Sequence, residues 1–339
     1  MSDSPNLSQP ARPIPDFARN AVNLASAGLG AHVVSVTDDF FAEARRMLAD
    51  AAPVFDPDAY DDHGKYMDGW ESIRRRGPGY DHAVVKLAVP GVLRGFDVDT
   101  SFFTGNFPNA CSIDACNVAG EPGADTVWTQ ILPITPLSAS AHHYLPSNSG
   151  SAWTHIRLNI YPDGGVARLR VYGEPVLDAD ALGGKSVDLA SALNGGRVIA
   201  YSDAHYGSFQ RLLSPGRGIN MGDGWETRRR RAPGNDWIIV ALGARGLIEA
   251  VEIDTAHYKG NYPDRVSIQA GDLAPGLDAL DSAVVTAAMF WDDILPSQKL
   301  GPDAIHRFNE VIAIGPVTHV RVNIFPDGGI SRLRLFGGL

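Results

Sequence analysis

Cysteine is scarce in this sequence, which has two in 339 residues, Cys111 and Cys116. Two cysteines at this spacing match neither a disulfide framework nor a zinc site. On a strand, their side chains would point to opposite faces, so the two thiols would not meet. We therefore expect two buried, reduced thiols in a protein of a reducing compartment.

Long apolar runs are also missing. No run approaches the roughly 18 apolar residues that identify a membrane-spanning helix. Residues 1–20 are polar and rich in proline, without the apolar stretch of a signal peptide. The sequence therefore predicts a cytoplasmic protein that has no membrane partner.

An excess of positive charge is missing as well. The chain has 29 Lys and Arg against 39 Asp and Glu, which gives a formal net charge of -10. This balance argues against nucleic acid as the main partner, because nucleic-acid-binding domains usually carry a basic surface. With 44% hydrophobic and 20% charged residues, the chain has the composition of a globular protein. Its local arginine clusters suit a small anionic ligand better than a polyanion.

Several motifs of cofactor-dependent and nucleophilic enzymes are absent. The sequence has no phosphate-binding loop, no nucleophile elbow and no HExxH zinc motif. The adjacent pair His142 and His143 does not by itself provide metal-ligand geometry. We therefore expect no cofactor and assign no metal ligands, although the sequence leaves open a metal held by scattered carboxylates.

A long internal repeat dominates the sequence. The matching segments are Val33–Phe41 with Val198–Tyr206, Asp68–Gly79 with Asp223–Gly234, Asp97–Pro108 with Glu252–Pro263, Trp128–Pro133 with Trp291–Pro296, and His155–Gly173 with His319–Gly337. A period of about 160 residues indicates two homologous domains and not a solenoid. We expect a tail at 1–20, a first repeat at 21–175, a linker at 176–196 and a second repeat at 197–339.

Short strands, frequent Gly and Pro, and little helix are expected in each repeat. A short helix is predicted after Thr37 and Asp38, which are natural N-caps for the apolar positions that follow. Residues 155–173 alternate polar and apolar side chains around a Pro-Asp-Gly-Gly turn, which predicts a β-hairpin. This pattern predicts an all-β protein with an antiparallel sandwich or jelly roll in each half.

The most unusual stretch is a charged loop that occurs twice. It reads DGWESIRRRGPG at 68–79 and DGWETRRRRAPG at 223–234. Arginine binds carboxylates and carbonyls with a two-pronged fork, so such a loop suits a small polar anion. A solvated, salt-bridged loop is the simpler interpretation of one copy alone. Duplication of the acids, the Trp, the arginines and the turn favours a binding site.

These residues resemble one known family. The doubled DGWE loop, the DVDTSFFTGNFP segment and the PDGG turn occur in the same order in both halves and are similar to the allantoicase (allantoate amidinohydrolase) family. The resemblance extends from about Val33 to Leu339. It implies two tandem antiparallel jelly-roll domains of the galactose-binding type. It also implies self-association into a homo-oligomer and hydrolysis of allantoate to ureidoglycolate and urea in purine and allantoin breakdown.

Release of urea from allantoate requires a proton for the leaving nitrogen and a water molecule for the carbon. Allantoate carries a carboxylate, which arginine can hold, and two ureido groups on one carbon. The predicted catalytic residues are the acid/base candidates Glu71 and Glu226, their orienting partners Asp68 and Asp223, and the proton relays His155 and His319. The predicted substrate-binding residues are Arg74, Arg75, Arg229, Arg230, Arg157, Arg321, Asn106, Asn261, His257 and Lys259.

Each of these residues also has a structural interpretation. The acids can neutralise neighbouring arginines, a strand histidine is often only hydrogen-bonded, and Gly-Asn turns explain the asparagines. The two copies differ, because Phe102 and Thr104 stand where the second copy has His257 and Lys259. The second copy is therefore the richer in titratable groups, and we expect it to hold the working site if only one copy does.

Two other function classes remain open at this point. A non-catalytic carbohydrate- or anion-binding tandem module would use the same fold, although an extracellular lectin usually carries a signal peptide and disulfides. A structural subunit would leave the repeated Arg and acid loops without a purpose. Release of urea from allantoate by the pure protein separates the enzyme from both.

Overall fold

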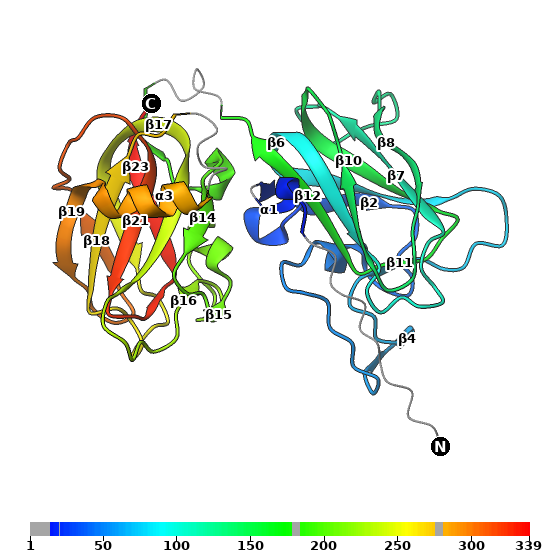
Figure 1. Cartoon of the computed structure of the whole chain (residues 1–339). Helices are drawn as coiled ribbons and strands as arrows, with labels where there is room; N and C mark the ends of the chain where they lie inside the picture. Colours follow the sequence, from blue (N-terminus) through cyan, green and yellow to red (C-terminus); the bar gives the residue numbers. More distant parts are fainter. Residues whose placement is uncertain (1–13, 20, 178–183, 275–280) are drawn as a thin grey trace. The chain divides into compact units, whose positions relative to one another are not determined.

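The computed structural model describes residues 14–19, 21–177, 184–274 and 281–339. The chain forms two compact units that divide between Gly173 and Glu174 (Figure 1). Each unit is an antiparallel β-sandwich, as the alternation of apolar and polar residues predicts. Among the described residues, no helix is long and apolar enough to cross a membrane.

In the first unit, one long strand, β6 (Asp81–Asp99), takes part in both layers of the sandwich. One layer contains β2, the start of β6, β10, β7 and β8, and the other contains β1, β12, the end of β6 and β9. The strands are β1 (Val22–Asn23), β2 (His32–Val36), β3 (Tyr60–Asp61), β4 (Gly64–Lys65), β5 (Trp70–Glu71), β7 (Ala110–Cys116), β8 (Thr129–Pro136), β9 (His142–Pro146), β10 (Ala152–Tyr161), β11 (Gly165–Val166) and β12 (Arg168–Pro175).

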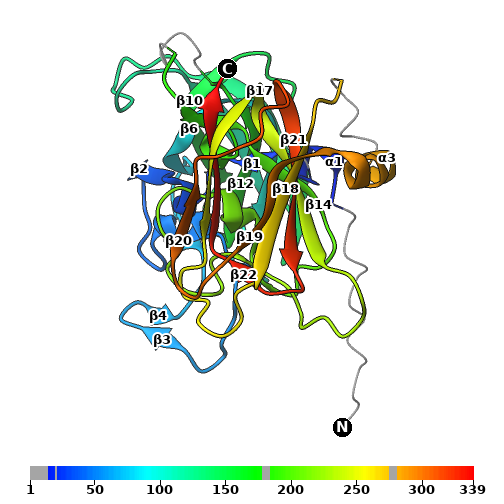
Figure 2. The ribbon, with the colours of Figure 1, turned by 90° about the vertical axis from the view of Figure 1, so that its left-hand side faces the viewer.

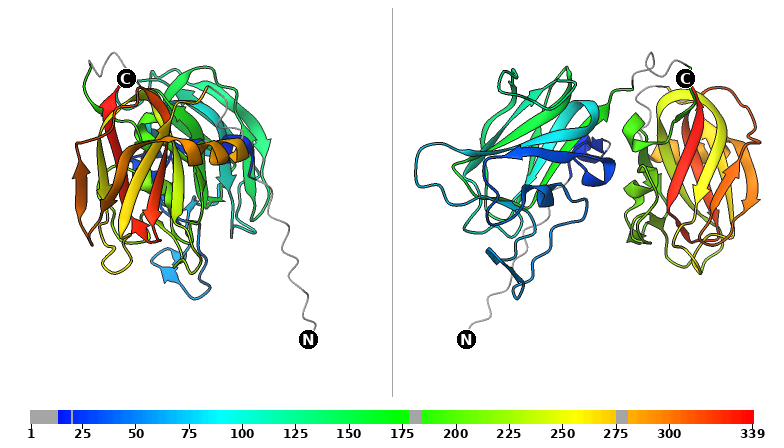
Figure 3. Two further views of the ribbon diagram at one scale, coloured as in Figure 1. Left: turned by 60° about the vertical axis from the view of Figure 1, so that its left-hand side comes forward. Right: turned by 180° about the vertical axis from the view of Figure 1, so that it is seen from behind.

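The second unit repeats this arrangement around the long strand β17 (Asp236–Asp254). Its other strands are β13 (Val187–Asp188), β14 (Arg197–Tyr201), β15 (Tyr206–Gly207), β16 (Trp225–Glu226), β18 (Arg265–Gly271), β19 (Asp292–Lys299), β20 (Ile305–Phe308), β21 (Val317–Phe325), β22 (Gly329–Ile330) and β23 (Arg332–Gly338). Figure 2 shows β18, β19 and β21 side by side, and Figure 3 shows the strands of each unit from two further sides. Helix α3 (Asp281–Ala287) packs beside β14.

Alternating strand residues build the core between the layers. On β10, Ile156, Leu158 and Ile160 are fully buried, and on β7 Ile113 is fully buried as well. Complete burial of such a side chain contributes about 1.5–3 kcal/mol, so these residues hold the two layers together. The loops at the ends of each sandwich are therefore held on a rigid scaffold.

The predicted β-hairpin at residues 155–173 was wrong. Strand β10 pairs with β6 and β7, whereas β12 pairs with β1 and β6 in the other layer. The Pro-Asp-Gly-Gly turn therefore leads the chain across the sandwich. Sequence alternation gives the two faces of each strand correctly, but it does not say which strand lies beside it.

The predicted helix after Asp38 was wrong in extent and in its cap. The described element is a 3-10 helix at Ala44–Leu48, and the residue before it, Glu43, makes no capping hydrogen bond. Asp38 instead accepts hydrogen bonds from the backbone of Phe40 and Ile73, at 3.3 and 2.6 Å. An Asp in a loop often binds backbone amides in this way, so N-cap composition alone does not locate a helix.

The segments predicted as a tail and as a linker both contain regular structure. Within the expected linker at 176–196, β13 pairs with β23 and therefore belongs to the second sandwich. Within the expected tail at 1–20, α1 (Asp16–Arg19) brings Phe17 against the Tyr172 ring, with 6.1 Å between the ring centroids. Residues 1–13 and 20 of that tail, and residues 178–183 of the linker, lie outside the described residues.

Candidate active site

A buried tryptophan fixes the acidic residue of each DGWE loop. Trp70 is fully buried, and its Nε1 donates to the carbonyl oxygen of Asp38 at 2.8 Å. The next residue, Glu71, lies opposite Gly165 in the short β5–β11 pairing. The second unit repeats the arrangement, with Trp225 donating to the carbonyl oxygen of Asp203 at 2.8 Å. The loop is therefore a folded element and not a mobile run of charges.

The Pro-Asp-Gly-Gly turn brings an asparagine to Glu71. Gly164 has a φ of 134°, and a Cβ there would lie 2.7 Å from the carbonyl oxygen of Asn106. The amide of Gly165 donates to that same oxygen at 2.7 Å. With its backbone held, Asn106 donates from Nδ2 to Oε1 of Glu71 at 2.6 Å. Three motifs that are distant in sequence thus meet at one carboxyl group.

The second unit contains the same convergence. Gly328 has a φ of 136°, and the amide of Gly329 donates to the carbonyl oxygen of Asn261 at 2.8 Å. Asn261 in turn donates from Nδ2 to Oε1 of Glu226. The predicted Glu and Asn residues of both copies are therefore brought together.

The environment of Glu71 alters its acidity. Burial raises the pKa of Glu71 above its ordinary value, and the hydrogen bond from Asn106 opposes that change without cancelling it. A carboxyl group with a raised pKa keeps its proton to higher pH, as a general acid requires. Glu71 is half-buried, so its carboxyl group is not sealed inside the protein.

The two DGWE aspartates hold the loop instead of facing the glutamates. Asp68 accepts from Nη2 of Arg168 at 2.7 Å. Asp223 accepts from Arg332 at 2.7 Å and from Arg211 at 2.6 Å. Burial alone would raise the pKa of Asp223, but the hydrogen bonds from these two arginines hold it below its ordinary value. Both ion-paired carboxylates therefore anchor the loop, and the lowered pKa makes Asp223 a poor proton donor.

The arginine runs divide into engaged and free members. Arg75 forms an ion pair with Asp81, and Arg230 forms one with Asp236 at 2.7 Å. Their backbone amides donate to Asp163 and Asp327, each at 2.8 Å.

Arg74 and Arg229 are exposed, and neither has an ion pair or hydrogen bond to another residue in the described part of the chain. Each of these free guanidinium groups follows its glutamate by three positions.

The two strand histidines are not brought to the glutamates. His155 lies on β10 six residues before Tyr161, roughly 20 Å of extended strand from the end where Glu71 sits. It is fully buried, with Nδ1 2.9 Å from the Thr154 hydroxyl, and burial lowers the pKa of His155. Burial lowers the pKa of His319 to about 4, so this residue is a neutral structural group near neutral pH.

Arg157 and Arg321 lie on the same two strands, each four residues before the strand's end. Arg157 pairs with Asp114 at 2.8 Å and lies over the Trp128 ring, 4.7 Å from its centroid. Arg321 lies over the Trp237 ring, again 4.7 Å from the centroid. The structure therefore uses both arginines to cover the outer face of a sheet.

His257 and Lys259 lie in the same segment as Asn261. His257 has a φ of 73°, its amide donates to Oδ1 of Asp303 at 2.8 Å, and its Nε2 is 2.7 Å from the carbonyl oxygen of Gly218. Lys259 is exposed. The first-unit counterpart of His257 is Phe102, whose φ of 69° shows the same strained turn.

Sequence reasoning missed the aspartates that hold the arginine loops. Asp163 and Asp327 bind the loop backbone, and Asp81 and Asp236 bind the side chains of Arg75 and Arg230. The signal was present, because each aspartate recurs at the matching place in both copies. Within the described ranges, no group of three His, Cys, Asp or Glu residues could hold a metal ion.

Comparisons with known proteins show the family of the chain. A family model described as the allantoicase repeat matches residues 22–176 and again 187–339. The chain is 56% identical over 326 residues to a probable allantoicase of Rhizobium meliloti, with 96% of each chain covered. It is 57% identical over 328 residues to probable allantoicase 1 of Burkholderia mallei, again with 96% of each covered.

A solved structure is similar over nearly the whole chain. The crystal structure of allantoicase from Saccharomyces cerevisiae superposes with a TM-score of 0.80 at 34% identity. The similarity covers 94% of this chain and 93% of that one. The family model covers both repeats and the solved structure has a similar fold, so the chain belongs to the allantoicase family.

Proposed function

We propose that the chain hydrolyses allantoate in its first unit, with Glu71 as the general acid. The observation that carries this assignment is the half-buried Glu71 carboxyl group, which Asn106 holds at 2.6 Å and whose pKa is raised by burial. Family membership supplies the reaction, in which allantoate is hydrolysed in purine and allantoin catabolism. This proposal departs from the expectation that the second copy holds the site, because His257 is already bound to the Gly218 carbonyl oxygen. The second unit carries the same pair, Glu226 and Asn261, and serves as an internal comparison.

The proton balance of the reaction fits one carboxyl group. The Glu71 proton goes to the ureido nitrogen as its bond to the central carbon breaks, and the nitrogen leaves as urea. Water oxygen then bonds to that carbon, and the Glu71 carboxylate takes one water proton, which restores the acid. The products are ureidoglycolate and urea. Asn106 orients the acid because its amide donates to one carboxyl oxygen.

We assign the substrate carboxylate to Arg74. A carboxylate that leaves water needs a charged hydrogen-bonding partner, and the Arg74 guanidinium is exposed and not already engaged within the described ranges. Arg75 is occupied by Asp81. The second unit contains the same division between Arg229 and Arg230. His257 is less suited to proton transfer than its residue type suggests, because its Nε2 already meets the Gly218 carbonyl.

Replacing Arg74 by Lys tests this assignment. The change keeps the charge but removes the two-pronged fork. One charge-assisted hydrogen bond is worth about 1.5–3 kcal/mol, so we expect KM for allantoate to rise roughly ten- to a hundredfold. The matched control is Arg75→Lys, which weakens the ion pair with Asp81 and should lower the melting temperature more than it changes KM. An unchanged KM in Arg74→Lys contradicts the assignment.

A carbohydrate-binding module would give a different result in an assay of urea release. Under the proposed function, the pure chain releases urea from allantoate without ATP or a nicotinamide. Tight sugar binding without any urea release would favour a carbohydrate-binding module instead. Self-association remains a prediction, which sedimentation velocity of the pure chain tests.

A further inference from the structure

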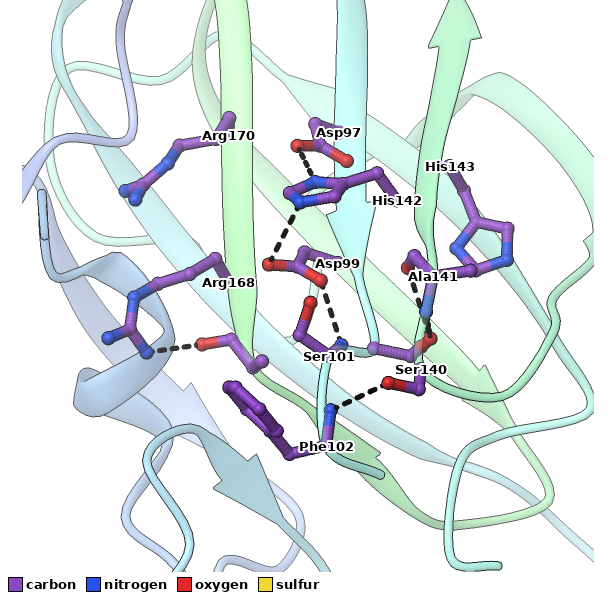
Figure 4. A network of polar contacts seen from close by, with 12 residues as sticks. Asp97, Asp99, Ser101, Phe102, Ser140, Ala141, His142, His143, Arg168 and Arg170 are labelled. Carbon is purple, nitrogen blue, oxygen red and sulfur yellow. Dashed lines mark hydrogen bonds and ion pairs between the residues drawn. The ribbon is translucent and has the colours of Figure 1, made fainter. Parts of the chain in front are cut away.

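A second polar cluster lies on the first unit, on the layer formed by β12, β6 and β9. His142 of β9 sits between two aspartates of β6 (Figure 4). Its Nδ1 donates to Oδ2 of Asp97 at 2.8 Å, and its Nε2 is 3.9 Å from Oδ2 of Asp99. The two carboxylates are buried, whereas half of the His142 side chain is exposed.

His142 supplies a compensating charge to both aspartates. Asp97 Oδ1 and Asp99 Oδ2 are buried without a hydrogen-bond partner in the described structure. Of the nearby arginines of β12, Arg168 binds Asp68, whereas Arg170 donates to the carbonyl oxygens of residues 49 and 50 and acts on Asp97 only through its charge. A buried carboxylate without a partner is costly, so the imidazolium of His142 stabilises the pair.

Asp99 connects this cluster to the loop that carries Asn106. Its Oδ1 accepts from the amide of Ser101 at 2.8 Å. The following residue, Phe102, is the strained one, and its amide donates to the Ser140 hydroxyl at 3.2 Å. The chain then continues directly to Asn106, which holds Glu71. The position of the general acid therefore depends on a turn that Asp99 caps.

In the second unit, an aspartate caps the matching turn, but no histidine stands at the position of His142. Asp254 accepts from the amide of Ala256 at 2.7 Å, as Asp99 does from Ser101. The residue opposite Asp254 on β20 is Ile305, whereas the residue opposite Asp99 on β9 is His142. The cluster is thus a property of the first unit, where we place the chemistry.

The adjacent histidine has a different and structural role. His143 accepts from the amide of Ser138 at 2.8 Å, and its second-unit counterpart His306 accepts from the amide of Gly301 at the same distance. Figure 4 shows His143 pointing away from the two aspartates. A histidine at that position is therefore common to both units and does not explain the cluster.

We propose that His142 is a positioning residue for allantoate hydrolysis, which holds the Asn106 loop and hence Glu71 through its charge on Asp99. This inference rests on the proposed function of Glu71. The charged and titratable groups that face His142 are Asp97 and Asp99 on β6, Tyr144 on β9, and Arg168, Arg170 and Tyr172 on β12.

The charge on His142 depends on pH in a defined direction. The hydrogen bond to Asp97 raises the pKa of His142 above its ordinary value, against the opposing effects of burial and of Arg170. The stabilising charge is therefore fully present below the ordinary histidine pKa, and it is lost as the pH rises through the raised pKa. Above that pH, Asp97 and Asp99 lose the positive charge of His142.

The first test compares kcat/KM for urea release between the wild type and His142→Ile, which copies the second unit, from pH 5.5 to pH 9. At pH 5.5 we expect kcat/KM of the wild type to be roughly tenfold higher than that of the variant, because about one charge-assisted hydrogen bond is lost. The ratio should then approach one as His142 loses its proton. A ratio that is constant with pH indicates a merely structural role and overturns the proposal. Glu71→Gln separates the two claims, because full activity there overturns both proposals, whereas lost activity with a constant ratio overturns only this one.

A second test needs no substitution and uses the wild-type chain. Hydrogen exchange is followed at the amides of Ser101 and Phe102, with Ala256 and His257 of the second unit as the internal control. We expect protection of the first pair to fall relative to the second as the pH rises through the pKa of His142. Equal pH dependence in both pairs contradicts the proposal.

Discussion

Glu71→Gln is expected to lower kcat for urea release from allantoate by about 10²- to 10⁴-fold, the contribution of a positioned general acid. The amide keeps the size of the side chain and can still meet Asn106, but it has no proton to give to the leaving nitrogen. KM should change little, because Arg74 binds the substrate carboxylate. Steady-state kinetics at several allantoate concentrations separate the two parameters.

The pH profile supplies a control for this prediction. A general acid works when protonated, so wild-type kcat/KM should fall as the pH rises through the raised pKa of Glu71. In Glu71→Gln the residual activity should lack that dependence on pH. A variant that keeps the wild-type rate and profile would show that another group donates the proton.

Asp223→Asn should have the largest effect on stability. The change leaves the buried Arg332 without its carboxylate, and Arg211 loses the same partner. Breaking a buried ion pair from one side costs about 3–5 kcal/mol. Because the pKa of Asp223 is depressed, its contribution is present at neutral pH and is lost as the pH falls through that depressed value.

The measurement is the free energy of unfolding in urea, followed by circular dichroism. The matched control is Arg245→Met, which removes an ion pair with Asp272 whose two side chains are both exposed. Solvent screens such exposed ion pairs, so the free energy of unfolding should change little in this control. Equal losses in the two variants would mean that the Asp223 ion pairs do not anchor the DGWE loop.

Much of the site could be predicted because the sequence presents it twice. Repetition selected Glu71 and Asn106 with their counterparts, and the structure brings each pair together. Repetition did not reveal that Asn106 contacts the acid, because the turn that joins them comes from residues 162–165. Contacts between distant segments depend on the sheet order, which alternation does not encode.

Which arginine of each run forms an ion pair could not be predicted, for a related reason. Neighbouring guanidinium groups are chemically identical in sequence, and only the buried Asp81 distinguishes Arg75 from Arg74. The same holds for His155, which looks like a relay on a polar face. Its distance from Glu71 is known only once the structure gives the length of β10 and the position of Glu71 beside Gly165.

The most direct test of the central claim compares urea release from allantoate by Glu71→Gln and Glu226→Gln at equal protein concentration. The two substitutions are chemically identical and occupy matching positions, each beside an asparagine. Our account predicts that Glu71→Gln keeps less than about a hundredth of wild-type activity, whereas Glu226→Gln keeps most of it. Full activity in Glu71→Gln, or a loss confined to Glu226→Gln, would contradict the assignment of the reaction to the first unit.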